Sequence, residues 1–318
     1  LGVKLFFRSK HHIVLTEEGM LLRKRAAEIL SLVQRTENEI SCSGETVVGL
    51  KFQTAPGGKG ANQAVQCAKL GIDTIMVGKV GRDTFGDSLV EKLKDYGVDC
   101  SCIGRSSSPT GVGVVHALED GTVYASIITG ANFDITSREI DGLDELIRNS
   151  RIVILQLEIP TEVVEHIIRK AKQYHVYTIL NAAPAKEMDL EVLKMADCLI
   201  VNETEASFYA GVEVTDGDMV RTHADRLRRL TEGTVIVTLG SKGSMLLGKE
   251  GAVPIDPVKV EHVTESTGAG DSYIGAFAYG KYKGMTDLQA CRFAARAASV
   301  TVTKIGAQEA MPRLNEIN

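Results

Sequence analysis

The stretch Glu265–Asp271, ESTGAGD, places a carboxylate directly after a glycine pair and before an apolar run typical of a helix. The first turn of a helix has free N–H groups and the positive end of the dipole, so the backbone of Gly268, Ala269 and Gly270 can bind an anion. Asp271 is ionised near neutral pH and can accept the proton of an attacking hydroxyl. These groups suit phosphoryl transfer, which needs chiefly positioning and charge neutralisation. A carboxylate that only caps a helix after a glycine turn is the alternative.

A second glycine-rich stretch, PGGKGANQAV, contains Gly58, Lys59 and Asn62. Its glycines let the backbone approach a ligand closely, and the Asn62 amide offers a donor and an acceptor suited to vicinal sugar hydroxyls. The spacing of a Walker phosphate loop is absent. Glu158 follows the apolar run in VILQLEIP, where a carboxylate needs a polar partner such as a ligand hydroxyl. These four residues are candidates for substrate binding; a simple turn and a solvated strand end are the alternatives.

Two further polar segments, NAAPA and NETEA, each follow an apolar run and supply Asn181, Asn202 and Glu205. Asn202 and Glu205 are three residues apart, so one helical turn can present both on the same face. Mg²⁺ is commonly held through waters and few carboxylates, which such a pair can supply together with contacts to phosphate oxygens. The alternative is a capping arrangement at the start of a helix.

The segment TLGSKGS follows the apolar run TVIV and contains Thr238, Gly240, Lys242 and Gly243. Backbone N–H groups and one cation in such a loop can bind a polyphosphate, so we take these residues, with Asn181 and Asn202, as candidates for nucleotide binding. A hairpin turn would have a similar sequence, so the segment alone does not decide between the two.

The elements that must position these residues begin at about residue 44. Apolar runs there are separated by helical stretches such as 84–96, 161–174 and 217–231. Near-continuous apolar strands with helical crossovers predict an α/β fold with a buried, mostly parallel sheet that is covered on both faces. In such folds the ligand lies beyond the carboxyl ends of the strands, where the candidate residues occur.

Composition limits the class of protein. The net charge of −5 argues against general nucleic-acid affinity, and no apolar run reaches the roughly 18 residues of a membrane span. The start of the sequence lacks the features of a signal peptide. The six cysteines are scattered without a CxxC pair, which favours reduced thiols over a zinc site or disulfides. We therefore expect a cytoplasmic protein without a membrane segment.

Residues 44 to about 313 resemble the phosphofructokinase-B type of carbohydrate kinases, the ribokinase family. GETVVG, PGGKGANQA, KVGRDTFGD, QLEIP, NETEA, TLGSKG, STGAGDSYIGA and KIGAQEAMP occur in the family's order. The resemblance implies a three-layer α/β/α sandwich with a small β lid, a homodimer formed through the lid, and Mg²⁺-dependent transfer of phosphate from ATP to a primary hydroxyl of a sugar. It implies that Asp271 is the base and Gly268–Gly270 the anion hole, and it assigns sugar contacts to Gly58, Lys59, Asn62 and Glu158. It also assigns phosphate and metal contacts to Asn202 and Glu205, and ATP contacts to Asn181, Thr238, Gly240, Lys242 and Gly243.

The sequence departs from the family's pattern at three points. Family members begin with a strand of the pattern VVVIGSxNxD, whose Asp binds the sugar, and nothing like it precedes Gly44. We therefore expect the first strand to be missing and activity to be impaired. The family also has Asp at the position of Glu265 and often Ser at that of Ala310, both near a monovalent-cation site. Potassium binding by Glu265, Thr267, Thr301, Lys304 and Gly306 is left as an open alternative.

Residues 1–40 differ from the rest. KLFFRSKHHIVLT is typical of a short basic hairpin, and residues 16–40 have the apolar spacing of one amphipathic helix. They resemble the wing and linker helix of a LysR-type regulator's DNA-binding domain, without the helix-turn-helix that precedes them. We thus expect a partial winged-helix domain at 1–40 and a kinase domain at 44–318. Specific DNA binding is not expected, because the base-reading helix is absent.

Three functions remain open at this point. The first is a sugar kinase, for which GGKGANQA together with QLEIP favours ribose. The second is a kinase of 2-deoxyribose, another pentose or a nucleoside. The third is a DNA-binding regulator whose kinase-like domain senses a sugar without turnover.

Overall fold

The computed structural model describes residues 5–8, 13–16, 20, 22–23, 54–117, 123–248 and 251–317. The chain divides into two compact units, residues 1–54 and 55–318. In the first unit, strands β1 (Phe6–Arg8) and β2 (Ile13–Leu15) pair antiparallel, so the predicted hairpin is confirmed. Most of the predicted helix at 16–40 lies outside the described residues. The resemblance to a LysR-type regulator and the boundary at 40–44 therefore stay predictions.

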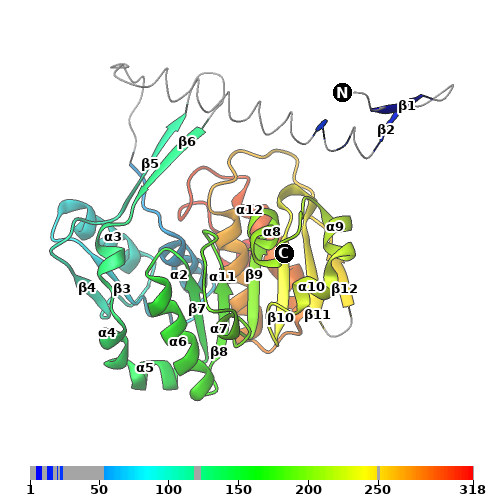
Figure 1. Ribbon diagram of the computed structural model, residues 1–318. Coiled ribbons are helices and arrows are strands. Elements are labelled where there is room, and N and C mark those ends of the chain that lie inside the picture. Colours follow the sequence, from blue (N-terminus) through cyan, green and yellow to red (C-terminus); the bar gives the residue numbers. More distant parts are fainter. Residues whose placement is uncertain are drawn as a thin grey trace. The chain divides into compact units, whose positions relative to one another are not determined.

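The second unit is built on a six-stranded sheet in the order β12-β11-β10-β9-β8-β7 (Figure 1). Strands β7 to β10 run parallel, whereas β11 pairs antiparallel with both of its neighbours. The predicted buried, mostly parallel sheet is confirmed. The strands are β7 (Ile152–Gln156), β8 (Tyr177–Asn181), β9 (Cys198–Asn202), β10 (Thr234–Thr238), β11 (Ser244–Gly248) and β12 (Gly251–Ile255).

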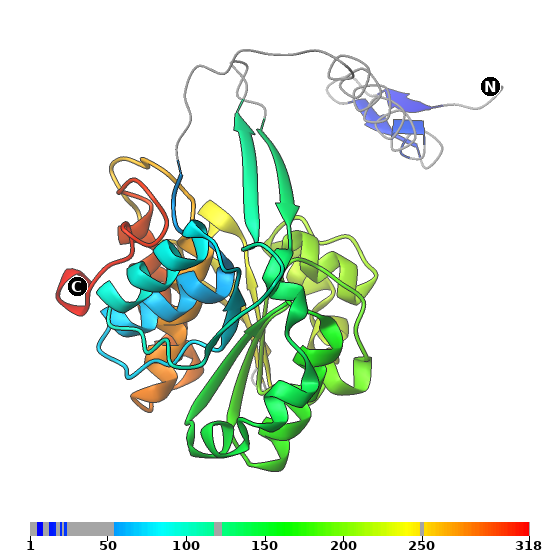
Figure 2. The same cartoon turned by 90° about the vertical axis from the view of Figure 1, so that its left-hand side faces the viewer.

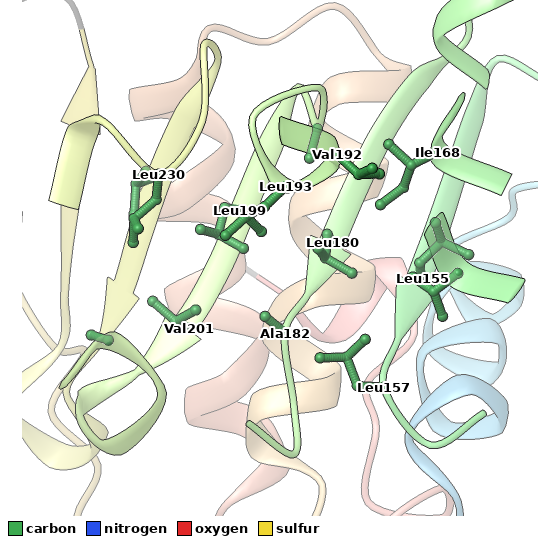
Figure 3. Close-up of a cluster of buried hydrophobic side chains, with 14 of the residues drawn as sticks. Leu155, Leu157, Ile168, Leu180, Ala182, Val192, Leu193, Leu199, Val201 and Leu230 are labelled. Carbon is green, nitrogen blue, oxygen red and sulfur yellow. The ribbon is translucent and has the colours of Figure 1, made fainter. Parts of the chain in front are cut away.

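Successive side chains of each strand point to opposite faces of the sheet, so helices pack on both faces and the fold has three layers. Leu199 and Val201 of β9 pack into one hydrophobic cluster, while Cys198 and Ile200 pack into another on the opposite face of the sheet. Figure 2 shows the helices on both sides of the sheet, and Figure 3 shows the first of these clusters. The first face is covered by α4 (Ser137–Asp141), α5 (Asp144–Asn149), α6 (Thr161–Gln173), α7 (Leu190–Leu193), α8 (Glu203–Ala210), α9 (Gly217–Thr222) and α10 (Ala224–Arg228), and the second by α2 (Lys59–Lys69), α11 (Ala269–Tyr282) and α12 (Asp287–Thr301).

A two-stranded hairpin projects from the three layers (Figures 1 and 2). It consists of β5 (Val112–Ala117) and β6 (Val123–Ile128), paired antiparallel and separate from the main sheet. Ile127 and Ile128 near its base are 65% and 53% exposed. This hairpin corresponds to the expected small β lid. The other elements are β3 (Gly78–Val80), α3 (Thr84–Asp95), β4 (Ile103–Arg105) and the short 3-10 turns η1 (Gly130–Asp134), η2 (Gly240–Lys242) and η3 (Leu314–Glu316).

Among the strand edges that lack a partner in the described residues are one edge of β7 and one edge of β3. β7 pairs only with β8, and β3 pairs only with β4, in parallel. Gly60 of α2 lies beside the end of β7 and the segment before β3, because a Cβ there would be 2.9 Å from Gln156 Oε1 and 3.3 Å from Met76 Cε. An inner strand that was missing would leave such a pair of edges. The absence of a first strand stays a prediction, because residues 24–53 lie outside the described part.

The helices of the described residues are all too short or too polar to span a bilayer.

Candidate active site

The carboxyl ends of the parallel strands bring four polar side chains to one edge of the sheet. Gln156, Asn181, Asn202 and Thr238 are the last residues of β7, β8, β9 and β10. The register aligns Gln156 with Asn181, and Asn202 with Thr238. The site thus lies where parallel α/β sheets bind their ligands.

Two helices begin at this edge, each after a glycine with a positive φ angle. Gly58 (φ 93°) precedes α2, and Gly268 (φ 77°) precedes α11. Residues with a Cβ rarely adopt such angles, so glycine is required at these turns. A Cβ on Gly268 would also lie 3.1 Å from the Cα and Cβ atoms of Ala307. The glycines therefore set where the first turns of α2 and α11 start.

Asp271 lies in the first turn of α11, and only 8% of its surface is exposed. Its Oδ2 atom accepts a hydrogen bond from Asn62 Nδ2 at 2.8 Å, and its Oδ1 atom accepts one from Gln63 Nε2 at 2.9 Å. Burial raises the pKa of Asp271, while the positive charge of Lys59 and these two hydrogen bonds oppose the rise. A carboxylate held by two donors and partly shielded from water is suited to accept a proton.

The predicted anion hole beside Asp271 is only partly free. The N–H of Ala269 donates to the carbonyl oxygen of Ser266 at 3.2 Å. Within the described residues, the N–H groups of Gly270 and Asp271 have no acceptor. These two groups, at the positive end of α11, can bind an anion.

The candidate substrate residues gather at the start of α2. The N–H of Lys59 donates to Glu158 Oε2 at 2.8 Å, which joins the loop after β7 to the turn at Gly58. The Lys59 ammonium acts on two buried carboxyl groups, Asp271 and Glu205, and opposes the rise of both pKa values. The residues predicted to bind substrate and base therefore share one site.

Asn202 and Glu205 form a capping box at the start of α8, as the structural alternative predicted. Glu205 N–H donates to Asn202 Oδ1 at 2.8 Å. The Glu205 carboxylate in turn accepts from the backbone N–H of Asn202 at 2.9 Å and from Asn202 Nδ2 at 3.1 Å. Burial raises the pKa of Glu205, which is 7% exposed. The pair therefore caps the helix, and its Glu205 carboxylate also interacts with the Lys59 ammonium.

The loop predicted to bind ATP connects β10 to the antiparallel strand β11, so it is also a hairpin connection. Gly240 and Lys242 are exposed, and Thr238 Oγ1 donates to the carbonyl oxygen of Val201 at 3.3 Å. Gly243 has a φ of 89°, and a Cβ there would lie 2.2 Å from a backbone oxygen of β12. Nucleotide binding by this loop stays a prediction.

Asn181 ends β8, and β9 lies between β8 and β10, the strand that leads into that loop. Its Oδ1 accepts from Gln63 Nε2 at 3.2 Å, and its Nδ2 donates to the carbonyl oxygen of Ile200 at 3.2 Å. Its side chain is 6% exposed and belongs to the hydrogen-bond network around Asp271. Its contact with ATP stays a prediction.

The residues considered for a monovalent cation are only partly brought together. The Glu265 carboxylate accepts from the N–H of Gly306 at 2.9 Å, and hydrogen bonds from Gly306 and Thr267 lower its pKa. Both donors direct hydrogen atoms at the group that would have to bind the cation.

The other two side chains of that set point elsewhere. Thr301 is buried and donates to Ser272 Oγ at 2.8 Å, and Lys304 forms an ion pair with Glu316. We therefore give potassium no role in the mechanism proposed below.

Three glutamines of the site were not predicted. Gln156 Nε2 donates to Gln63 Oε1 at 2.6 Å, and Gln308 Nε2 donates to Asn62 Oδ1 at 3.1 Å. Each lies inside a segment quoted above, GANQA, QLEIP or KIGAQEAMP, next to or within two residues of a polar or glycine position that the sequence did single out. Their position within these segments, close to residues already chosen as candidates, was the one feature of the sequence that could have predicted them.

The family profile described as "pfkB family carbohydrate kinase" matches residues 28–314. A ribokinase of Lactococcus lactis subsp. lactis is 35% identical over 290 residues, which cover 91% of this chain and 92% of that protein. A deoxyribokinase of Salmonella typhi is 32% identical over 284 residues, which cover 88% of this chain and 92% of that protein. The structure of Arabidopsis thaliana ribokinase complexed with ribose and ATP matches with a TM-score of 0.80 at 33% identity, and covers 86% of this chain and 90% of that one. The matched length includes the sheet, both helical layers and the site, and the chain belongs to the pfkB family of carbohydrate kinases.

Proposed function

We propose that this chain transfers the γ-phosphoryl group of ATP to the primary hydroxyl of ribose, giving ribose 5-phosphate and ADP. The observation that carries the proposal is the buried Asp271 carboxylate, which two amides hold at the positive end of α11, close to Lys59. Similarity to ribokinases supports the choice of sugar. Because ATP is the donor, we also place the protein in the cytoplasm.

The side chains suggest a division of roles. Glu158, Asn62 and the backbone at Gly58 would bind ring hydroxyls and direct the primary hydroxyl to Asp271. Asp271 would accept the hydroxyl proton as the sugar oxygen bonds to the γ-phosphorus, and the bond to ADP breaks. The N–H groups of Gly270 and Asp271 would bind the charged phosphoryl oxygens, and the Lys59 ammonium would offset their charge.

We propose that Mg²⁺ is held through waters by Glu205 and Asn202. No group of three or more His, Cys, Asp or Glu side chains gathers to bind a metal in the described ranges, which suits an ion held mainly by waters and phosphates. Each Glu205 oxygen accepts one hydrogen bond from Asn202 and keeps a lone pair for a water. When bound, the ion would neutralise charge on the nucleotide phosphates.

Glu205→Gln should raise the Mg²⁺ concentration needed for half-maximal rate by roughly tenfold. Glutamine can also complete a capping box, so the helix start is kept while the charge is lost. Glu203→Gln, which removes another acid from the first turn of α8, is the matched control and should leave that concentration unchanged. Equal Mg²⁺ requirements in Glu205→Gln and the parent protein would remove Glu205 from the metal site.

The second candidate substrate is 2-deoxyribose, which the similarity to a deoxyribokinase favours. Comparison of kcat/KM for ribose, 2-deoxyribose and adenosine at saturating ATP decides between these sugars. We expect the highest kcat/KM for ribose. A higher kcat/KM for 2-deoxyribose would make 2-deoxyribose the substrate in its place.

We also propose that two copies associate through the β5–β6 hairpin. A two-stranded ribbon is marginally stable alone, and Ile127 and Ile128 expose apolar surface on opposite faces of it. One face would cover the site and the other would meet the partner copy. Sedimentation velocity should therefore show a dimer. Of the two substitutions Ile127→Glu and Ile128→Glu, the one on the partner-facing side should dissociate it, and the other should leave it intact. A monomeric parent protein at micromolar concentration would contradict this proposal.

A further inference from the structure

The orientation of the Gln63 amide follows from its contact with Asp271. An ionised carboxylate only accepts hydrogen bonds, so Gln63 must present Nε2 to Asp271 Oδ1, at 2.9 Å. The Oε1 atom of Gln63 then faces away and accepts from Gln156 Nε2 at 2.6 Å. Gln63 is 1% exposed, so water does not replace these contacts. The chain of contacts from Gln156 through Gln63 to Asp271 has one direction.

A second arm reaches the other carboxylate oxygen. Asn62 Nδ2 donates to Asp271 Oδ2, which turns Asn62 Oδ1 towards Gln308 Nε2. Gln308 Oε1 is then left as the one buried side-chain polar atom without a partner in the described ranges. Leaving a buried acceptor unsatisfied is unfavourable, so a stronger requirement must impose this orientation. That requirement is the acceptor-only carboxylate of Asp271.

Few charges act on this carboxyl. In the described part of the chain, Lys59 at the start of α2 is the charged group that acts on Asp271. Glu205 at the start of α8 also interacts with Lys59, and Glu158 after β7 accepts from the Lys59 backbone. The residue that β7 directs into this network, Gln156, is neutral. With so few charges, neutral amide donors have a large share in setting the state of Asp271.

We propose that Gln63, itself oriented by Gln156, is a positioning residue that fixes the plane of the Asp271 carboxylate and keeps it ionised in the working pH range. Gln63 does not touch the reacting atoms, and its effect passes through Asp271. The inference rests on the proposed role of Asp271 as the base. It gives the glutamines of GANQA and QLEIP a shared role. They come from α2 and β7 (Figure 1), and Gln156 bonds to Gln63, which in turn bonds to Asp271.

The test is the pH dependence of kcat/KM for ribose, whose acid limb reports the base of the free enzyme. Gln63→Leu removes a donor to a charged group, which raises the pKa of Asp271, so a higher pH is needed to ionise it. We expect the acid limb to move up by about one pH unit. Gln156→Leu should move it in the same direction by less, since Gln63 would keep its donor but lose its orientation.

Gln66→Leu is the matched control. Gln66 lies one turn further along α2, is fully buried, and bonds to Pro312 and Ser272 but not to Asp271. Its acid limb should coincide with that of the parent protein. Thermal unfolding and ATP binding identify any variant that fails to fold, and Gln156→Leu, at the edge of the network, then carries the test.

An acid limb that stays in place in Gln63→Leu or in the folded Gln156→Leu, with only a lower rate at all pH values, would overturn the proposal. So would an equal displacement in Gln66→Leu. Asp271→Asn separates this failure from that of the proposed function. If Asp271→Asn is inactive and the limb does not move, only the role of Gln63 is wrong, whereas an active Asp271→Asn removes the base on which both depend.

Discussion

Asp271→Asn should lower kcat by roughly 10²–10⁴-fold while ATP binding stays near that of the parent protein. Asparagine has nearly the same shape but cannot accept the hydroxyl proton. The two surrounding donors, Asn62 Nδ2 and Gln63 Nε2, would also meet one oxygen and one NH₂ group in place of two oxygens. Single-turnover rates with saturating ribose, together with calorimetric titration of ATP, measure the two quantities separately.

Asp287→Asn provides the matched control for this prediction. Asp287 is a partly buried aspartate in the first turn of another helix, α12, where it pairs with Lys281 and accepts from Thr234. Its substitution should reduce stability without lowering kcat. A transfer rate in Asp271→Asn equal to that of the parent protein would leave Asp271 with a structural role only.

The pH dependence of the parent enzyme should agree with the burial of Asp271. Burial raises the pKa of this group above that of an exposed aspartate, about 3.9. Because the base must be ionised, kcat/KM falls as the pH drops through the raised pKa. The acid limb should therefore have its midpoint above the ordinary aspartate value.

Ribose should bind to this chain about tenfold to a hundredfold more weakly than to a ribokinase that has the family's first strand, while ATP binding should be comparable. The sequence before Gly44 predicts that the family's sugar-binding Asp is missing, and loss of a charged hydrogen-bond partner costs about 1.5–3 kcal/mol. The edge of β7 that is unpaired in the described residues lies beside α2, which carries Asn62 and Lys59. The candidate nucleotide residues, by contrast, all lie within the matched sheet and its loops.

Calorimetric titration with ribose and with ATP measures this difference, with the Lactococcus lactis ribokinase as the comparison. A variant in which residues 1–43 are replaced by a strand of the VVVIGSxNxD pattern should regain ribose affinity and unfold at a higher temperature. Ribose affinity equal to that of the comparison protein, before any such replacement, would show that the first strand and its Asp are dispensable or replaced.

The sequence predicted the sheet because its strands are apolar on both faces. Leu199 and Ile200 pack on opposite faces, which a continuous apolar run requires, and the polar residues that follow such runs meet at one edge because the strands are parallel. Asp271 could be placed because a glycine pair before an apolar run marks a helix start. These inferences depend on neighbours along the chain, where spacing carries the information.

The hydrogen-bond network could not be predicted in the same way. Gln63 and Asp271 are 208 residues apart, and no local pattern tells which of the polar residues near Gln63 meets the base. The pair Asn202 and Glu205 shows another limit, since a capping box and a metal-linked carboxylate use the same residues at the same spacing. Asn181 was placed correctly at a strand end, but its partner Gln63 comes from a helix more than 100 residues away.

The products that the purified chain forms from ATP, Mg²⁺ and ribose test its proposed ribose kinase activity most directly. We expect ADP and ribose 5-phosphate in equal amounts, with phosphate on the primary hydroxyl, and a rate that falls by at least about a hundredfold in Asp271→Asn. Release of ADP without sugar phosphate, phosphate on another hydroxyl, or the same products at the same rate from Asp271→Asn would contradict the account.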